Sequence, residues 1–307
     1  MKGIAGRADP RPVPERTKGM QTRTTLKVAL PKGRMQEGVF ELLADAGLPV
    51  HGDDRDYRPS LAMEGLEAKI LKPRNIIEML HAGTRDIGFA GSDWVSELDL
   101  ELVELLDTGL DPVRLVAAAP TSILVEGRLP RRHLIVASEY ERIARSWIVA
   151  KGLDATFVRS YGATEVFPPD DADCVVDNTA TGSTLRANGL SIVDEVAQST
   201  TKLYANPAAM EDPAKREMAE AVVLLLRSVL NARGRVMLEI NVPADKLEAV
   251  VAILPCMREP TISQLMADAG YAVKVAAPKA SLAMLIPEIR RRGGSDIIVT
   301  EPSRIVP

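Results

Sequence analysis

Residues 173–190 read DCVVDNTATGSTLRANGL, and this stretch decides how the fold is interpreted. Its apolar centre is typical of a buried strand, with Asp173 before it and Asp177 after it. Small hydroxyl residues around Gly182 follow, and then a segment with the composition of a helix start. Strand, turn and helix start form the repeating unit of open α/β sheets, which bind ligands at the carboxyl ends of their strands. The stretch therefore predicts an α/β fold with a site at this turn.

The turn itself has the composition of a phosphate-binding loop. Backbone N–H groups at a helix N-terminus converge on one point, and hydroxyl groups add further donors. Glycine in the turn permits close backbone approach. Carboxylates beside such a loop suit sugar hydroxyls, with a divalent cation nearby. A ribose 5-phosphate pocket is one interpretation and a polar surface turn is the other; the candidate residues are Asp173, Asp177, Thr181, Gly182, Ser183 and Thr184.

Two further strand-end loops carry polar residues. PKGR (31–34) follows an apolar run, and Lys32 and Arg34 bracket Gly33 where a pyrophosphate or triphosphate could bind. The alternative for this loop is a pair of solvated charges. GFAGSDW (88–94) places Gly91 and Asp93 after another strand. Three such loops together favour a ligand site over three unrelated turns.

The composition excludes several classes of protein. A net charge of −4 and an aromatic content of 4% give no reason to expect a nucleic acid or a membrane as partner. Cys174 and Cys256 are far apart, so neither a disulfide framework nor a zinc site is expected. The three histidines lack metal-ligand spacing, and no metal-ligating residue is assigned. Residues 1–24 lack an apolar core and are expected to form a mobile extension of a cytoplasmic protein.

Short apolar runs alternate with helical patterns between residues 25 and 234, which predicts an α/β part with two lobes. The first lobe is expected to comprise residues 25–117 and 202–234, and the second residues 118–201. Separate strands are expected in LVELLDTG and VRLVAAAP. Ser92 is expected to cap one helix, and the spacing of Ser138 and Glu141 predicts a capping box for another.

The pattern changes after a long helix that is expected to run from Pro213 to Arg233 and to end at Gly234. Residues 235–307 read as β-α-β-β-α-β, which is the order of a ferredoxin-like domain.

Four quoted segments carry a resemblance to a known family. They are LKVALPKGRM (26–35), DIGFAGSDWV (86–95), the opening stretch 173–190, and STTKLYANP (199–207). With them the chain resembles the ATP phosphoribosyltransferases, the first enzymes of histidine biosynthesis. LPCMREPTISQL (254–265) and SDIIVTEPSRIV (295–306) resemble the regulatory domain of the long form of that family. The resemblance runs from about Leu26 to the C-terminus.

This resemblance implies a fold and a reaction. The catalytic part should resemble the two lobes of periplasmic binding proteins, with the active site in the cleft between them. The family condenses ATP with phosphoribosyl pyrophosphate (PRPP), with Mg2+, to N1-phosphoribosyl-ATP and pyrophosphate. The long form is a hexamer in equilibrium with dimers, and L-histidine inhibits it at the C-terminal domain.

The resemblance also implies roles for the candidate residues. The loop 181–184 matches the 5-phosphate loop, and Asp177, with Asp173, matches the acids near the ribose. Lys32, Gly33 and Arg34 match the loop that faces pyrophosphate or nucleotide phosphates. Gly91 and Asp93 match the loop on the nucleotide side of the family's site. Glu165, within YGATE, matches a glutamate near the cleft.

One feature departs from the family pattern, since Asn178 and Thr179 replace an expected aliphatic pair. Three alternatives stay open on the sequence alone. They are a solute-binding module without activity, a catalytically silent paralogue, and a phosphoribosyltransferase with another nitrogen nucleophile.

Overall fold

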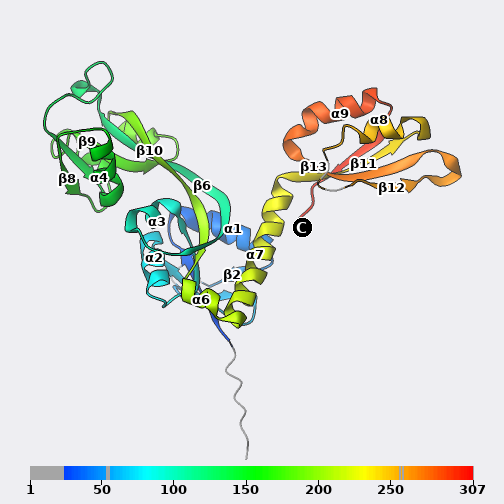
Figure 1. The fold of residues 1–307 in the computed structure, drawn as a ribbon, viewed down its shortest axis with the longest axis horizontal. Coiled ribbons are helices and arrows are strands. Elements are labelled where there is room, and N and C mark those ends of the chain that lie inside the picture. The colour runs from blue at the N-terminus through cyan, green and yellow to red at the C-terminus, as the bar shows by residue number, and fades with distance from the viewer. Residues whose placement is uncertain (1–23, 53–55, 256, 258, 307) are drawn as a thin grey trace, which may run out of the picture.

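The computed structural model describes residues 24–52, 56–255, 257 and 259–306. Two α/β lobes share one eight-stranded sheet, and a C-terminal domain has its own four-stranded sheet (Figure 1). The expected fold class, two α/β lobes followed by a ferredoxin-like domain, is confirmed. The extension expected at residues 1–24 lies, apart from Thr24, outside the described residues.

The first lobe has three neighbouring parallel strands, and helices cover both faces of its sheet. Strand β1 lies between β4 and β5, and its apolar run is almost wholly buried, as a strand covered on both faces requires. Helices α1 and α7 pack on one face, and α2 and α3 on the other. The elements are β1 (Leu26–Pro31), α1 (Arg34–Asp45), β2 (Val50–His51), β3 (Ser60–Leu61), β4 (Leu66–Leu71), α2 (Pro73–His81), β5 (Ile87–Gly91) and α3 (Ser92–Leu98).

Two long antiparallel strands, β6 (Val103–Pro120) and β10 (Leu190–Ala205), cross from the first lobe to the second (Figure 1). The expectation of two separate strands in the region of β6 is wrong. Gly109 and Asp111 have positive φ angles of 65° and 47°, and the register with β10 shifts there. These residues therefore form a bulge that bends one strand instead of ending it.

The second lobe continues the same sheet. Strand β9 pairs antiparallel with β6 and parallel with β7, which pairs in turn with β8. Helix α4 packs on one face through Trp147 and Ile148, and α5 packs on the other through Leu185. The elements are β7 (Leu134–Ser138), α4 (Glu141–Ala150), β8 (Ala155–Arg159), β9 (Cys174–Thr179) and α5 (Ser183–Ala187).

After β10 the chain forms α6 (Pro207–Glu211) and the long helix α7 (Pro213–Arg233), with the expected bounds. Asp212 caps α7, because its carboxylate accepts hydrogen bonds from the N–H groups of Ala214 and Lys215. The helix leads directly into the C-terminal domain (Figure 1).

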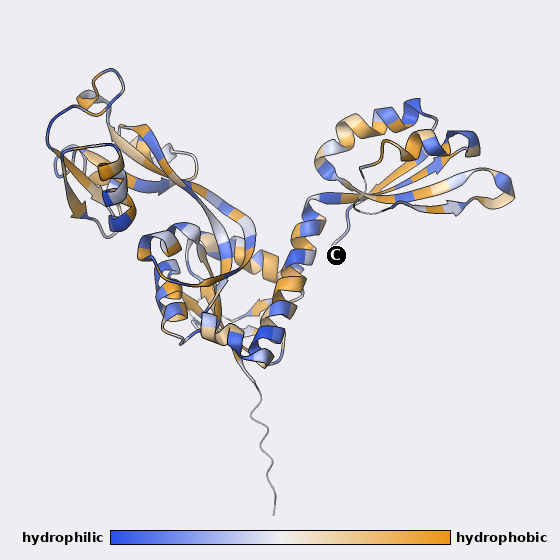
Figure 2. Ribbon diagram, viewed as in Figure 1, coloured by the Kyte–Doolittle hydropathy of each residue, from blue (hydrophilic) through white to orange (hydrophobic). Residues whose placement is uncertain are grey.

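The C-terminal domain has the expected ferredoxin-like order. Its strands are arranged β12-β13-β11-β14, and α8 and α9 pack on one face of the sheet. Apolar and polar residues alternate along these strands (Figure 2). The elements are β11 (Arg235–Val242), α8 (Leu247–Val251), β12 (Thr261–Gln264), β13 (Tyr271–Pro278), α9 (Leu282–Arg291) and β14 (Ser295–Thr300).

The C-terminal tail returns to the first lobe. Arg304 Nε donates a hydrogen bond of 3.0 Å to the carbonyl of Asp45 at the end of α1. The N–H of Ile305 donates to the carbonyl of Ser228 in α7 at 2.9 Å. The C-terminal domain is therefore attached to the first lobe at two points, through α7 and through the tail.

Both expected helix caps are wrong. Ser92 is the first residue of α3, and its hydroxyl donates to Ser199 Oγ instead of capping the helix. Ser138 Oγ donates to the carbonyl of Val176, and no side chain within α4 caps that helix. Its first N–H groups donate instead to Glu97 of the other lobe, so a tertiary contact replaces the local cap.

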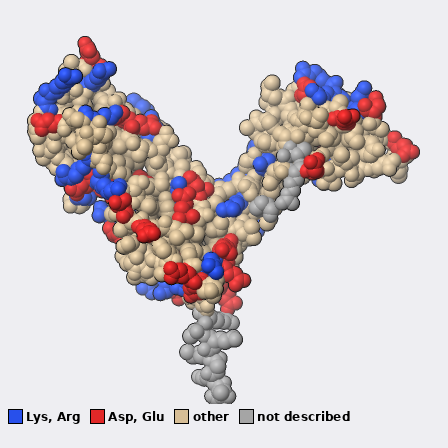
Figure 3. All heavy atoms as spheres, viewed as in Figure 1, with Lys and Arg blue, Asp and Glu red and all other residues tan. Residues whose placement is uncertain are grey.

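The surface carries mixed charges. On the face drawn in Figure 3, Lys and Arg are interspersed with Asp and Glu over both lobes. Among the residues that the structure describes, no helix has the length and apolar character needed to cross a membrane.

Candidate active site

The carboxyl ends of four strands, two from each lobe, meet around two adjoining hollows of about 210 and 370 Å3. The smaller, hereafter the first hollow, is lined from the first lobe by Lys32, Arg34, Gly91, Asp93 and Trp94. The larger, the second hollow, is lined by Glu165, Asp177, Thr181, Ser183 and Thr184. Arg34, Glu139 and Asn178 line both. The two hollows are therefore neighbouring halves of one cleft between the lobes.

The hydroxyl loop lies at one end of the second hollow. Gly182 has a φ of 74°, in the left-handed region that favours glycine. Thr179 Oγ1 accepts a hydrogen bond of 2.8 Å from the N–H of Gly182 and fixes the turn. Thr181 Oγ1 donates to Ser183 Oγ at 3.0 Å. Thr181, Ser183 and Thr184 thus line the second hollow together.

Three carboxylates line the second hollow, on Asp177, Glu165 and Glu139. Burial, together with the negative charges of Glu165 and Glu139, raises the pKa of Asp177 to about 6. The N–H of Asn178 donates to Asp177 Oδ1 at 2.7 Å and partly offsets this effect. The hollow therefore favours a ligand that brings positive charge or hydroxyl donors.

Asp173 does not join these carboxylates. It precedes β9, whereas Asp177 lies near the other end of that strand. Its carboxylate accepts hydrogen bonds from Arg132 at 2.7 Å and from the N–H of Ile135 at 2.8 Å. Although burial raises the pKa of Asp173, these hydrogen bonds hold it below its ordinary value. The expectation that both acids face the ribose is corrected, because they lie at opposite ends of one strand.

The cationic residues follow β1. Gly33 has a φ of 92° with open space around its Cβ position, so the backbone turn itself requires glycine. Lys32 Nζ donates a hydrogen bond of 2.6 Å to the Tyr57 hydroxyl and lies 4.6 Å from the centre of that ring. The Arg34 guanidinium has no hydrogen bond or ion pair with any residue that the structure describes. It is therefore available to a ligand.

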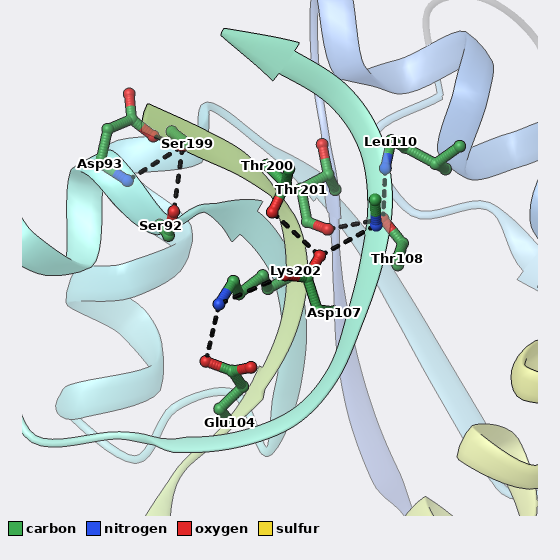
Figure 4. Close-up of polar contacts among 11 residues, drawn as sticks. Ser92, Asp93, Glu104, Asp107, Thr108, Leu110, Ser199, Thr200, Thr201 and Lys202 are labelled. Carbon is green, nitrogen blue, oxygen red and sulfur yellow. Dashed lines mark hydrogen bonds and ion pairs between the residues drawn. The ribbon is translucent and has the colours of Figure 1, made fainter. Parts of the chain in front are cut away.

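Asp93 is buried, and its carboxylate is engaged within the protein (Figure 4). Oδ1 accepts a hydrogen bond of 2.8 Å from Ser199 Oγ, and Oδ2 accepts one of 2.6 Å from the Tyr140 hydroxyl. Burial, together with the charge of Asp93, raises the pKa of Tyr140, which keeps its proton and remains a donor. Asp93 thus forms part of the wall of the first hollow.

Glu139, Tyr140 and Trp94 were not among the sequence-derived candidates. The sequence offered one signal for the first two, since they lie between Ser138 and Glu141, whose spacing predicted a helix start. That signal was assigned to a helix cap. The Trp94 and Tyr140 rings lie 4.7 Å apart in the first hollow, which no local pattern indicates.

No described group of three acidic, histidine or cysteine residues is arranged to hold a metal ion by itself. The carboxylates of Glu139, Glu165 and Asp177 nevertheless supply the hard oxygen ligands that Mg2+ prefers. Because Mg2+ is commonly bound by one or two carboxylates together with substrate phosphates, this donor set fits an ion that arrives with a phosphorylated substrate.

Known proteins resemble this chain over most of its length. A family model described as ATP phosphoribosyltransferase matches residues 72–228, and one described as the HisG C-terminal domain matches residues 232–303. An ATP phosphoribosyltransferase of Chlorobium luteolum is 38% identical over 286 residues, which are 92% of this chain and 97% of that protein. One of Pelotomaculum thermopropionicum is 37% identical over 287 residues, covering 92% of this chain and 99% of the relative.

A solved structure has a similar fold. A chain of the ATP phosphoribosyl transferase (HisG:HisZ) complex from Thermotoga maritima superposes with a TM-score of 0.57 at 24% identity. The superposition covers 66% of this chain and 99% of that one.

Proposed function

The chain belongs to the ATP phosphoribosyltransferase family of histidine biosynthesis, and we propose that it joins ATP to PRPP, giving N1-phosphoribosyl-ATP and pyrophosphate. The observation that carries this proposal is the pair of adjoining hollows, which share Arg34, Glu139 and Asn178. A transfer between two bulky polyanions needs two binding regions that meet where the bond forms.

The second hollow suits the phosphoribosyl group. The loop 181–184 offers hydroxyl and N–H donors to the 5-phosphate, as glycine-containing turns at helix starts do elsewhere. Asp177 and Glu165 face the same space and would accept hydrogen bonds from the ribose hydroxyls.

The first hollow suits ATP. The Trp94 ring, which packs against the buried Tyr140 ring, lines it and offers an apolar surface for a purine. Lys32 and Arg34 also line it and would offer positive charge to phosphate oxygens. Since Arg34 also lines the second hollow, it would contact the pyrophosphate group of PRPP.

The chemistry follows from this placement. Adenine N1 attacks the anomeric carbon of the ribose, a C–N bond forms, and the C–O bond to pyrophosphate breaks. Positive charge develops on the sugar ring, where Asp177, Glu165 and Glu139 would stabilise it. Lys32 and Arg34 would stabilise the negative charge that leaves with pyrophosphate.

Magnesium, when bound to the pyrophosphate, would neutralise further leaving-group charge. Glu139, Glu165 and Asp177 are the residues that would hold it, together with water and phosphate oxygens.

Regulation is assigned to the C-terminal domain. We propose that L-histidine binds within residues 235–307 and inhibits the transfer, and that the protein is a cytoplasmic hexamer in equilibrium with dimers. The support is the match of residues 232–303 to the C-terminal domain of this family.

The test is a direct assay. Purified protein is mixed with ATP, PRPP and Mg2+, and phosphoribosyl-ATP is followed by mass, with and without L-histidine. We expect product, and less of it when L-histidine is added. Folded protein that binds ATP but forms no product would contradict the proposed reaction. Product that does not respond to L-histidine would contradict the regulatory part alone.

A further inference from the structure

A chain of hydrogen bonds connects the two lobes along the wall of the first hollow. Ser199 Oγ donates to Asp93 Oδ1 at 2.8 Å, and Figure 4 shows this contact between β10 and α3. Tyr140 OH donates to Asp93 Oδ2 at 2.6 Å, and Asn178 Nδ2 donates to Tyr140 OH at 2.9 Å. We name Asn178, Tyr140, Asp93 and Ser199 the interlobe brace. It runs from the first lobe to β9 of the second.

Contacts beside the brace fix the same pair of helices. Glu97 in α3 accepts hydrogen bonds of 3.1 Å from the N–H groups of Arg142 and Ile143 in α4. Trp94, also in α3, packs its ring against Tyr140. The end of α3 and the start of α4 are thus held together.

Asn178 has a distinctive place in this arrangement. It lines both hollows, and its side chain extends the brace to the strand that carries Asp177. Its own N–H donates to the Asp177 carboxylate at 2.7 Å. One residue therefore contacts the acid of the second hollow through its backbone and the aromatic wall of the first through its side chain.

We propose that Asn178 is a positioning residue: through Tyr140 and Asp93 it sets the separation between the two hollows, so that the reacting atoms of the two substrates meet. This inference rests on the proposed function. Small displacements of reacting groups cost large factors in rate, because a transfer between bound substrates depends on their alignment. Asn178 acts on that alignment without supplying a reacting group.

The first test separates turnover from binding. Asn178→Leu keeps the approximate size of the side chain and removes its donor. We expect kcat to fall about tenfold, while the KM values for ATP and PRPP each change less than about threefold, since each hollow keeps its own contacts. Asn241→Leu is the matched control, because its amide makes a comparable hydrogen bond, of 3.1 Å to Asp296, in the C-terminal domain. It should leave kcat unchanged.

The second test asks whether Asn178 works through Tyr140. Tyr140→Phe keeps the ring against Trp94 and removes the hydroxyl that connects Asn178 to Asp93. If the two act as one unit, the double variant loses no more activity than Tyr140→Phe alone. Amide hydrogen exchange supplies a readout without substrate: the N–H groups of Arg142 and Ile143 should exchange faster in both single variants.

The outcomes are distinct. Any one of three results would overturn the inference. They are an unchanged kcat in Asn178→Leu, losses that multiply in the double variant, and unchanged amide exchange at Arg142 and Ile143. If Asn178→Leu does not fold, Tyr140→Phe with the exchange measurement decides. Wild-type protein that forms no phosphoribosyl-ATP would refute the proposed function. The amide-exchange measurement then tests the interlobe brace by itself: faster exchange in the variants supports it, and unchanged exchange overturns it.

Discussion

Asp93 occupies the space that a side chain at position 91 would need, because a Cβ on Gly91 would lie 2.1 Å from Asp93 Oδ1. Gly91→Ala must therefore displace the Asp93 carboxylate from Ser199 and Tyr140. We expect the free energy of unfolding to fall by about 1–3 kcal/mol. We also expect kcat/KM to fall at least about tenfold, because the wall of the first hollow moves. Urea denaturation and steady-state rates measure both effects.

Gly234→Ala is the control, since open space and a φ of −88° accept a methyl group there. An equal loss in that variant would contradict the steric explanation.

Asp177 and Asp173 offer a matched pair on one strand. Asp177→Asn should lower kcat/KM by about 100-fold, because the carboxylate faces the hollow in which positive charge develops. Asp173→Asn should retain activity within about threefold, because that carboxylate pairs with the half-exposed Arg132, and such pairs contribute little. The measurement is the product-formation rate of both variants beside the wild type. Comparable losses in the two variants would show that the separation of these acids does not determine their roles.

The pH profile of the reaction should have an acid limb. Asp177 must be ionised to act on the ribose, and its pKa is raised to about 6. We expect kcat/KM to fall as the pH drops below about 6 and to be flat above it. Since the charge of Glu139 contributes to that raised pKa, Glu139→Gln should move the acid limb to lower pH. A limb that stays in place in this variant would mean that another group controls the profile.

Stability should respond to pH in the opposite sense to activity. Because the pKa of folded Asp177 lies above the ordinary value of 3.8, protonation favours the folded state and ionisation disfavours it. Asp177→Asn should therefore raise the free energy of unfolding above pH 6, by up to about 3 kcal/mol. The gain should shrink as the pH falls from 6 toward 4. Urea denaturation across this range is the measurement, and a gain independent of pH would refute burial of the charge as its cause.

Arg304 connects the tail of the C-terminal domain to the end of α1, and Arg34 lies at the start of the same helix. If L-histidine acts from the C-terminal domain, Arg304→Ala should leave uninhibited turnover within about twofold and raise the L-histidine concentration for half inhibition about fivefold or more. Arg291→Ala is the control, since that exposed arginine pairs with Glu288 inside the domain. Unaltered inhibition in Arg304→Ala would exclude the tail as a route of coupling.

The sequence predicted the elements whose residues interact with near neighbours. The apolar runs of β1 and β5, the helix 213–233 with Asp212 before it, and the β-α-β-β-α-β order of the C-terminal domain all follow from local periodicity and capping. Strand-end loops also indicated the region of the site, because the carboxyl ends of parallel strands gather ligands in this class of sheet.

What the sequence did not predict depends on contacts between distant residues. The start of α4 is capped by Glu97, 45 residues away from Arg142, so a local Ser–Glu spacing gave the wrong cap. Asp173 and Asp177 are close in sequence but belong to opposite ends of a strand. Glu139 and Asn178 line both hollows only because the two lobes meet there, and no local sequence pattern predicts that contact.

The crossing strands have a consequence for how the chain could be divided. Val113 of β6 and Ser199 of β10 are paired neighbours, so the chain leaves the first lobe and re-enters it at adjacent points. Topologically, the stretch between them is an insertion at the tip of a β-hairpin. One continuous segment of the chain therefore forms the second lobe, and a two-residue turn could replace it. The minimal unit that remains would carry the loops after β1 and β5, but not the hydroxyl loop that we assign to the 5-phosphate.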